Sequence, residues 1–188
     1  MAYFPLFIEM KNLKILVVGG GTIAYEKLEK LTDFTKNITI ITIEVMPNIQ
    51  EIVQKYHLTL TQKPYQKNEC LAYDIVIIAT NNIEIHQQIY KESRGSRTLV
   101  NSVDNTKYCD FIFPSYLKQD DLTIAFSTSG ASPAFAKKIK YYFKNKIPSN
   151  IGDFLEEMKG LREKIPKGRE RMVYFEKKVE EYFKKNFK

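Results

Sequence analysis

The sequence is poor in the residues and runs that mark several classes of protein. Its only two cysteines, Cys70 and Cys109, have no metal-type spacing and would make a meagre disulfide framework, so we expect reduced thiols and a cytoplasmic protein. No apolar run reaches the roughly 18 residues that a membrane span requires. The apolar start, MAYFPLFIEM, has no basic leader, and we therefore expect neither a signal peptide nor a membrane segment.

Net charge is concentrated in the C-terminal third of the chain. Residues 137–188 hold 16 Lys and Arg against 8 Asp and Glu, whereas residues 1–136 hold 13 against 14. Such a basic region suits an acidic partner, either nucleic acid or a small molecule with several carboxylates. A solvated, lysine-rich helix surface explains the same charge without any partner.

Short apolar runs alternate with helical patterns through the first hundred residues. The runs are apolar on both faces, which is typical of a parallel sheet covered by helices on two sides. Past residue 103 the pattern changes to two segments, 111–117 and 122–127, that predict an antiparallel hairpin. Ser132 and Pro133 then begin a helix, and two amphipathic helices follow residue 151, broken near 166–168. The predicted strands of the sheet are residues 14–18, 38–43, 58–62, 74–79 and 98–103, with helices over 46–56 and 83–93.

A glycine-rich loop joins the first strand to the first helix in the stretch VVGGGTIAYEK. Gly19 permits the tight turn, Gly21 lets the backbone approach a pyrophosphate, and Ala24 keeps the helix near the sheet. The amides of Gly21, Thr22 and Ile23 begin the helix, where its dipole favours an anion. In this strand–loop–helix context the pattern predicts a Rossmann-like dinucleotide-binding domain, and a glycine turn without a ligand is the plainer alternative.

The end of the second strand indicates which dinucleotide binds. Ile43 and Glu44 follow that strand, close to where an acidic residue holds the ribose hydroxyls. No Lys or Arg lies between residues 38 and 54 to neutralise a 2′-phosphate, so we expect NAD as the cofactor. Thr80 and Asn81 follow the central strand, where loop residues commonly flank a cofactor, although a turn alone also explains them.

Asp104 is the candidate catalytic residue in the stretch LVNSVDNTKYCDFIFPS, residues 99–115. It comes just past a predicted parallel strand, and ligands of open α/β sheets lie beyond the carboxyl ends of the strands. A carboxylate partly withdrawn from water there is a usable proton acceptor, which oxidation by hydride transfer requires. The alternative is a turn, which Asp and Asn also favour.

Four segments together resemble the precorrin-2 dehydrogenase family, the NAD-dependent enzymes of siroheme biosynthesis. They are YFPLFIEMK, ILVVGGGTIAYEK, LVNSVDNTKYCDFIFPS and LTIAFSTSGASPAFAKKIK, and the resemblance covers residues 1–145. It implies oxidation of the polycarboxylated tetrapyrrole precorrin-2 to sirohydrochlorin by a homodimer whose hairpin regions interlock. It also implies that Asp104 is the base and that Thr22, Ile23, Ile43 and Glu44 contact NAD.

The expected architecture follows from the pattern and the resemblance together. We expect an α/β chain with a Rossmann-like parallel sheet over residues 1–113, a dimerisation hairpin and helix over 114–148, and a small helical C-terminal domain over 149–188. Substrate contacts are expected from Asn101 and from the hydroxyls of Ser127, Thr128 and Ser129, which strand ending and helix capping also explain. We expect no nucleic-acid or membrane partner.

Two other functions compete with the dehydrogenase. A bifunctional enzyme would also insert ferrous iron, although His57 and His86, the only histidines, lack ligand spacing and no metal site is expected. A non-catalytic NAD-sensing module would need the glycine loop but not Asp104. Loss of activity without loss of NAD affinity on mutation of Asp104 distinguishes the enzyme from the sensor.

Overall fold

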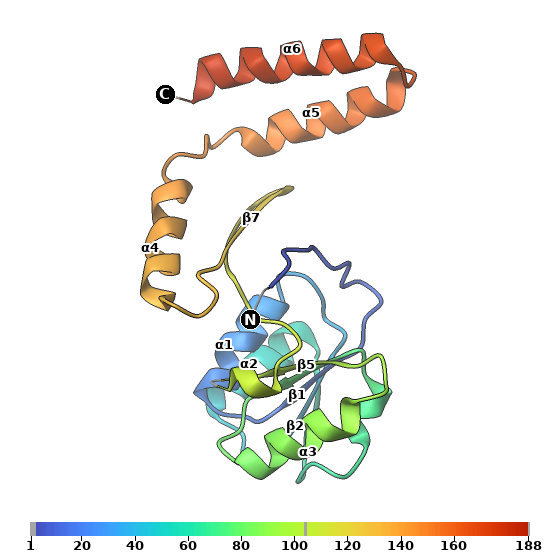
Figure 1. Cartoon of the computed structure of the whole chain (residues 1–188), viewed down its shortest axis with the longest axis vertical. Helices are drawn as coiled ribbons and strands as arrows, with labels where there is room; N and C mark the ends of the chain where they lie inside the picture. The colour runs from blue at the N-terminus through green and yellow to red at the C-terminus, as the bar shows by residue number, and fades with distance from the viewer. Residues whose placement is uncertain (1–2, 104, 188) are drawn as a thin grey trace. The chain divides into compact units, whose positions relative to one another are not determined.

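The computed structural model describes residues 3–103 and 105–187, and the chain divides into two compact units (Figure 1). The first unit runs from Tyr3 to Ile112, and the second begins at Phe113. Asp104 lies outside the described residues. None of the helices within the described residues is long and apolar enough to cross a membrane.

The first unit is built on a five-stranded parallel sheet. Its strands are β1 (Ile15–Val18), β2 (Ile38–Thr42), β3 (Thr59–Gln62), β4 (Ile75–Ile78) and β5 (Leu99–Ser102), in the order β3-β2-β1-β4-β5. The chain winds outward from β1 to β3 and then returns to place β4 on the other side of β1. The carboxyl ends of β1 and β4 therefore form a topological switch point, which is where open α/β sheets bind ligands.

Helices cover both faces of this sheet, so its central strands are apolar throughout. Every residue of β1 and β4 is buried. One face packs its side chains against Ile89 of α3 (Ile83–Ser93), and alternation along the strands turns the neighbouring side chains to the opposite face. The helices α1 (Thr22–Leu31) and α2 (Pro47–Tyr56) contact each other, and short 3-10 turns η1 (Glu69–Ala72) and η2 (Thr106–Tyr108) complete the unit.

The second unit contains the predicted hairpin and three helices. Strands β6 (Ser115–Gln119) and β7 (Leu122–Phe126) pair antiparallel, and α4 (Pro133–Lys144) packs against β6. Ser132 caps α4 by accepting a hydrogen bond from the amide of Phe135. The helices α5 (Ile151–Lys164) and α6 (Arg169–Asn186) are joined by stacked rings of Phe154 and Tyr182, whose centroids lie 4.0 Å apart.

The expected fold class is confirmed, and one strand boundary is wrong by more than a single residue. The hairpin begins at Ser115 and not at Phe111. Phe111 instead runs beside β5, where its carbonyl accepts a hydrogen bond from the Asn101 side chain at 2.9 Å. Pro114 has no N–H to offer a strand partner, which suits the point where the hairpin begins.

Candidate cofactor and catalytic site

The glycine loop is shaped by close packing at its first two positions. Gly19 has φ +124°, and a Cβ there would lie 2.3 Å from the carbonyl oxygen of Ala79, at the end of β4. A Cβ at Gly20 would lie 2.3 Å from the carbonyl oxygen of Glu44, beyond β2. Since both obstacles are backbone, neither glycine can be replaced without moving a strand end. These two glycines bring the loop tightly onto the carboxyl edge of the sheet.

Gly21 differs from its neighbours because open space lies in front of it. A Cβ at Gly21 would meet nothing within 4 Å, and this residue is the N-cap of α1. No side chain caps α1, and its first turn holds no acidic residue. The first amides of a helix lack intrahelical partners and carry the positive end of the dipole. This arrangement can accept a pyrophosphate at the start of α1.

The predicted ribose-binding segment lies beside the glycine loop. The Thr42 hydroxyl donates a hydrogen bond to the Glu44 carbonyl at 2.7 Å, and the Met46 amide donates to the Gly20 carbonyl at 3.1 Å. Both contacts fix the backbone around Glu44 and leave its side chain exposed. On the neighbouring strand end, Lys63 is paired with Glu69. The charge of Lys63, which follows the neighbouring strand β3, is therefore balanced by Glu69.

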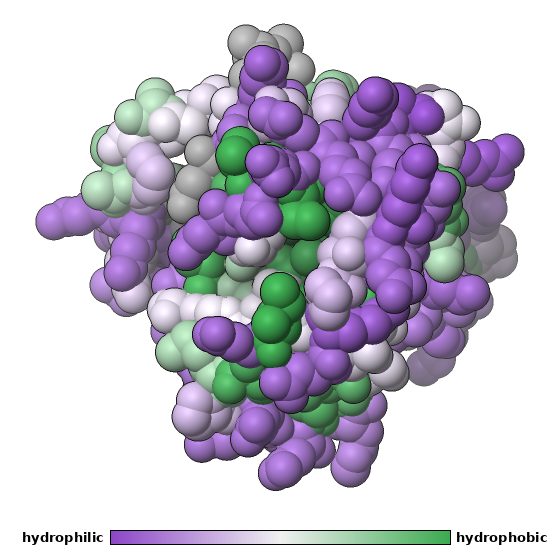
Figure 2. Space-filling model, turned by 90° about the horizontal axis from the view of Figure 1, so that it is seen from below, coloured by the Kyte–Doolittle hydropathy of each residue, from purple (hydrophilic) through white to green (hydrophobic). Residues whose placement is uncertain are grey.

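Exposed apolar side chains also occur at this edge of the sheet. Ile43 is 66% exposed, and Met46 and Ile83, at the starts of α2 and α3, are also exposed. The Thr22 hydroxyl contacts the Met46 sulfur at 3.7 Å, which links the starts of α1 and α2. Figure 2 shows a face of the molecule on which apolar side chains gather in a recess among hydrophilic ones. Flat rings bind to apolar surfaces of this kind at the rim of an α/β sheet.

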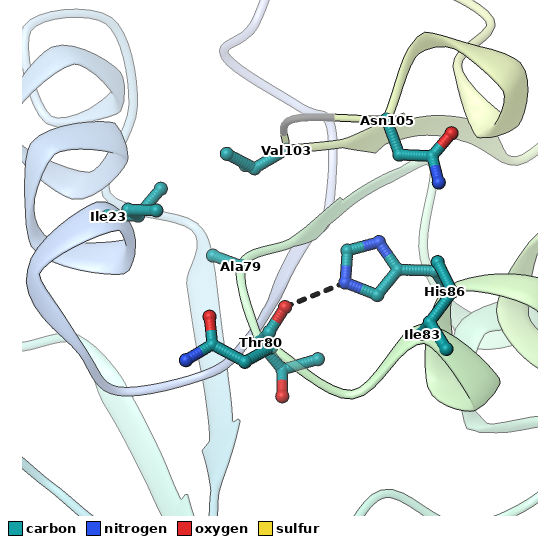
Figure 3. A pocket seen from close by; sticks show the side chains of 8 residues that line it. Ile23, Ala79, Thr80, Ile83, His86, Val103 and Asn105 are labelled. Atoms are coloured by element: carbon teal, nitrogen blue, oxygen red, sulfur yellow. Dashed lines mark hydrogen bonds between the residues drawn. The ribbon is translucent and has the colours of Figure 1, made fainter.

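A cavity of about 230 Å³ lies at the switch point (Figure 3). It brings together three residues predicted to bind the cofactor: Ile23 from α1, and Thr80 and Asn81 from the loop after β4. Val103 and Asn105, the two neighbours of Asp104 in sequence, also line it. The complete lining is Ile23, Ala79, Thr80, Asn81, Ile83, His86, Val103 and Asn105.

The loop that carries residues 103–108 is closed by Cys109. The Cys109 sulfur accepts a hydrogen bond from the Ser102 amide at 3.2 Å and donates one to the Ser102 carbonyl at 3.1 Å. Burial raises the pKa of the Cys109 thiol, so it remains neutral and can keep donating. Two hydrogen bonds thus hold Cys109 at the last residue of β5, and the cavity-lining residues Val103 and Asn105 lie between them in sequence.

Asp110 gives the loop a second anchor. Its carboxylate accepts two hydrogen bonds from the Arg94 guanidinium, at 2.8 and 2.6 Å, and a third from the Val100 amide at 2.9 Å. The Asp110 amide in turn donates to the Val100 carbonyl at 2.8 Å. Hydrogen bonding to Asp110 raises the pKa of Arg94 further above its ordinary value. A bidentate pair of this geometry fixes orientation as well as charge.

His86 is a feature of the site that sequence reasoning missed. It is buried in α3, with Nε2 2.7 Å from the Thr80 carbonyl (Figure 3). Its Nδ1 lies 2.6 Å from the Ser102 hydroxyl. The sequence shows only a histidine without ligand spacing. Its position four residues after the N-cap Asn82, which places it on the first turn facing both strand ends, is the signal that could have identified it.

The residues predicted to bind substrate fall into two groups. Asn101 is 5% exposed, and its amide donates to the Phe111 carbonyl, which gives it a structural task on β5. Ser127, Thr128 and Ser129 belong to the second unit. There the Ser127 hydroxyl accepts from the Ser129 amide at 3.1 Å, and the Thr128 hydroxyl accepts from the Ser132 amide at 3.0 Å. A substrate-binding role for all four remains a prediction.

This combination of a doubly wound parallel sheet, a glycine loop at the start of α1 and a cavity at the switch point defines a Rossmann-type dinucleotide-binding protein. A family model described as "Putative NAD(P)-binding" matches residues 6–115, and the chain belongs to this family. The expectation of a nicotinamide dinucleotide cofactor is confirmed at this level. The choice between NAD and NADP depends on the residues around Glu44.

Two curated relatives illustrate the wider likeness. The chain is 30% identical over 162 residues to siroheme synthase of Pseudoalteromonas atlantica and 30% identical over 184 residues to that of Methylococcus capsulatus. These matches cover 85% and 96% of this chain but only 35% and 39% of the relatives. They confirm the resemblance inferred from the four motifs. The chain thus spans little more than a third of the length of these siroheme synthases.

A solved structure confirms the fold over both units. The protein named SirC, precorrin-2 dehydrogenase, aligns with a TM-score of 0.76, covering 90% of this chain and 85% of that one. The two sequences are 24% identical in this alignment. The fold of this chain, with its parallel sheet, hairpin and C-terminal helices, is therefore one already seen in another protein.

Proposed function

We propose that this chain is a cytoplasmic NAD-dependent dehydrogenase that oxidises precorrin-2 to sirohydrochlorin. The observation that carries the proposal is its match, across 85% and 96% of its length, to siroheme synthases, combined with membership of an NAD(P)-binding family. The basic C-terminal third suits a substrate with many carboxylates. The likeness in fold to a precorrin-2 dehydrogenase supports the same assignment.

The chemistry divides between the cofactor and the protein. Bound NAD would supply the hydride acceptor for the tetrapyrrole, and the same oxidation requires that one proton leave the substrate. We assign that proton to the carboxylate of Asp104. Support comes from the described neighbours Val103 and Asn105, which both line the cavity at the switch point. The Cys109 and Asp110 contacts hold the ends of this loop so that the base can be positioned before substrate arrives.

NAD is preferred over NADP in this proposal because of charge. Glu44 ends the segment after β2 and would repel a 2′-phosphate, while Lys63 on the adjacent strand end is engaged by Glu69. The contacts assigned to the cofactor are those of Gly19, Gly21, Thr22, Ile23, Ile43, Glu44, Thr80 and Asn81. The start of α1 would hold the pyrophosphate, and the exposed apolar residues of this edge would receive the flat rings.

The decisive experiment is anaerobic incubation of the purified chain with precorrin-2 and NAD. Formation of NADH in step with sirohydrochlorin is the expected result, and NADP should support a much lower rate. Absence of NADH with intact, nucleotide-binding protein would refute the proposed activity.

Iron insertion is the second candidate function, and the same experiment tests it. Among the residues that the structure describes, no group of three or more His, Cys, Asp or Glu side chains could hold a metal ion. Iron insertion does not require a resident metal site, because the macrocycle supplies the nitrogens. Ferrous iron is therefore added after NADH formation is complete, and we expect no siroheme above the uncatalysed control.

We further propose that the chain acts as a homodimer, with residues 114–148 forming the contact and residues 149–188 a separate helical domain. Support comes from aromatic side chains exposed on α4, among them Phe135 at 59% and Tyr142 at 57%. Large exposed apolar groups clustered on one helix mark an interaction surface. In a symmetric dimer the same surface of two copies meets, so a second copy of this chain would bury the patch.

A further inference from the structure

His86 joins the two strand ends that border the cavity. One ring nitrogen meets the carbonyl of Thr80, in the loop after β4, at 2.7 Å. The other meets the hydroxyl of Ser102, the last residue of β5, at 2.6 Å. The ring itself lines the cavity and is 4% exposed (Figure 3). One side chain therefore connects the loop predicted to contact the cofactor with the strand end that precedes the catalytic loop.

The chemistry of the two partners determines which nitrogen of the neutral His86 ring donates and which accepts. A backbone carbonyl only accepts hydrogen bonds, so Nε2 must carry the proton that faces Thr80. In the neutral ring Nδ1 then accepts, and the Ser102 hydroxyl donates to it. With both nitrogens engaged, the ring is held in one tautomer and one orientation. It has no free nitrogen with which to exchange a proton with substrate.

The position of His86 argues for more than filling space. The core on this face of the sheet is formed by aliphatic side chains such as Ile78, Ile89 and Val100. An aliphatic residue at position 86 would fill the same volume but would leave the Thr80 carbonyl and the Ser102 hydroxyl without this partner. Leaving buried polar groups unpaired costs free energy. Thr80 lines the cavity, and Ser102 directly precedes Val103, which also lines it.

We propose that His86 is a positioning residue for the dehydrogenation, acting through Thr80 on the cofactor and through Ser102 on the loop that carries the base. This inference rests on the proposed function and deepens it. It assigns a separate effect to each of the two ring nitrogens of His86. The Nε2 contact governs nucleotide affinity, and the Nδ1 contact governs the rate of the chemical step.

Two conservative substitutions separate these two effects. In His86→Gln the side-chain amide can reach the Nε2 position and keep donating to Thr80, whereas the acceptor for Ser102 is lost. In His86→Asn the side-chain oxygen can take the place of Nδ1 and keep the Ser102 contact, whereas the donor to Thr80 is lost. Ser102→Ala removes the same contact as His86→Gln without touching the ring. His57→Asn, at a left-handed position that Asn tolerates, is the control.

The measurements are NADH binding by fluorescence, without tetrapyrrole, and kcat for NADH formation with precorrin-2 and NAD. We expect His86→Asn to weaken NADH binding about fivefold, the loss of roughly one hydrogen bond. We expect His86→Gln and Ser102→Ala to lower kcat at least tenfold while binding NADH like the wild type. Because both substitutions remove the same contact, the kcat of the His86→Gln/Ser102→Ala double variant should be no lower than that of the slower single variant.

The inference fails if His86→Asn and His86→Gln lower NADH affinity and kcat to the same extent, and the loss follows the decrease in melting temperature. The ring would then have only a structural role. It also fails if Ser102→Ala, the variant least damaging to the fold, keeps the wild-type kcat. A wild-type chain that binds NADH but does not oxidise precorrin-2 refutes the proposed function instead. In that case the NADH measurement alone still tests the effect assigned to the Thr80 contact.

Discussion

A Cβ on Gly20 would lie 2.3 Å from the carbonyl oxygen of Glu44, whereas a Cβ on Gly21 would meet nothing within 4 Å. Adjacent glycines of one loop thus serve different purposes. Gly20 allows the loop to pack against the end of β2, and Gly21 leaves space at the start of α1. Packing within the unit requires a glycine at position 20, whereas only a bound ligand would require one at position 21.

The two glycines should therefore fail differently when replaced by alanine. Gly20→Ala forces a backbone shift of the kind that costs about 1–3 kcal/mol, which for a chain of this size lowers the melting temperature by about 2–12 °C. Gly21→Ala should leave the melting temperature unchanged and weaken NADH binding about tenfold, because the methyl group enters the pyrophosphate position. Thermal unfolding and fluorescence titration of both variants check this. Equal behaviour of the pair would contradict it.

Glu44 should set the preference for NAD over NADP. Glu44→Gln removes the charge that repels a 2′-phosphate while keeping the size of the side chain, and the ratio of NAD to NADP affinity should fall about five- to tenfold. Most of the change should be a gain in NADP binding. Glu51→Gln, on the exposed side of α2, is the matched control and should leave the ratio unaltered. A ratio unchanged in both variants would remove Glu44 from the cofactor site.

Stability in acid should depend on Glu92. Burial opposes ionisation of this carboxylate, but hydrogen bonds from Tyr65, Gln88 and the Asn68 amide outweigh burial and lower its pKa below the ordinary 4.5. The folded value is thus below the unfolded one, so the stabilisation is present above pH 4.5 and lost as pH falls through the folded value.

The Glu92→Gln variant should accordingly be less stable than the wild type near pH 6 and lose less stability between pH 5 and pH 3. Urea unfolding at a series of pH values measures this, with Glu51→Gln again as the control that keeps the wild-type slope. Parallel curves for wild type and Glu92→Gln would show that the carboxylate contributes nothing specific.

The exposed rings of α4 should hold the dimer together. Replacing Phe135 and Tyr142 by Glu places charges on a surface that we propose is buried between subunits, and such burial is strongly unfavourable. Light scattering should report twice the chain mass for the wild type and the chain mass for the double variant. Lys137→Glu and Lys144→Glu, charge changes on the same helix, are the controls for a general effect of charge. A monomeric wild type would overturn the proposal outright.

The sheet could be predicted from sequence because burial on both faces leaves a plain signal. Each of the runs at residues 14–18 and 74–79 contains a strand, and the errors are single residues at the ends. At Ala79 the apolar run continues past the last ladder partner, and this side chain already borders the cavity, whereas Lys14 and Asp74 lie one residue before the first ladder partners. The helix at residues 83–93 was predicted at its observed bounds, since Asn82 caps it as sequence rules expect.

The contacts around the site could not be predicted in the same way. His86, Thr80 and Ser102 come from three elements, and no spacing along the chain shows that the His86 ring meets the Thr80 carbonyl and the Ser102 hydroxyl. The same holds for Arg94 and Asp110, whose pairing depends on the path of the chain after β5. Asn101 could be singled out as a polar residue in an apolar strand, but only the fold shows that its amide holds Phe111.

Asp104 remains the residue on which the proposed chemistry depends. Asp104→Asn preserves size and polarity but cannot accept the substrate proton, and we expect kcat to fall by about 10²–10⁴, the usual contribution of a general base. The Kd for NADH should stay within about twofold of the wild-type value, because the contact that is lost is to the substrate and not to the cofactor. Asn105→Ala, beside it on the same loop, is the control for loop disturbance and should lose far less activity. If Asp104→Asn turns over precorrin-2 at the wild-type rate, another group takes the proton and the assignment of the base is wrong.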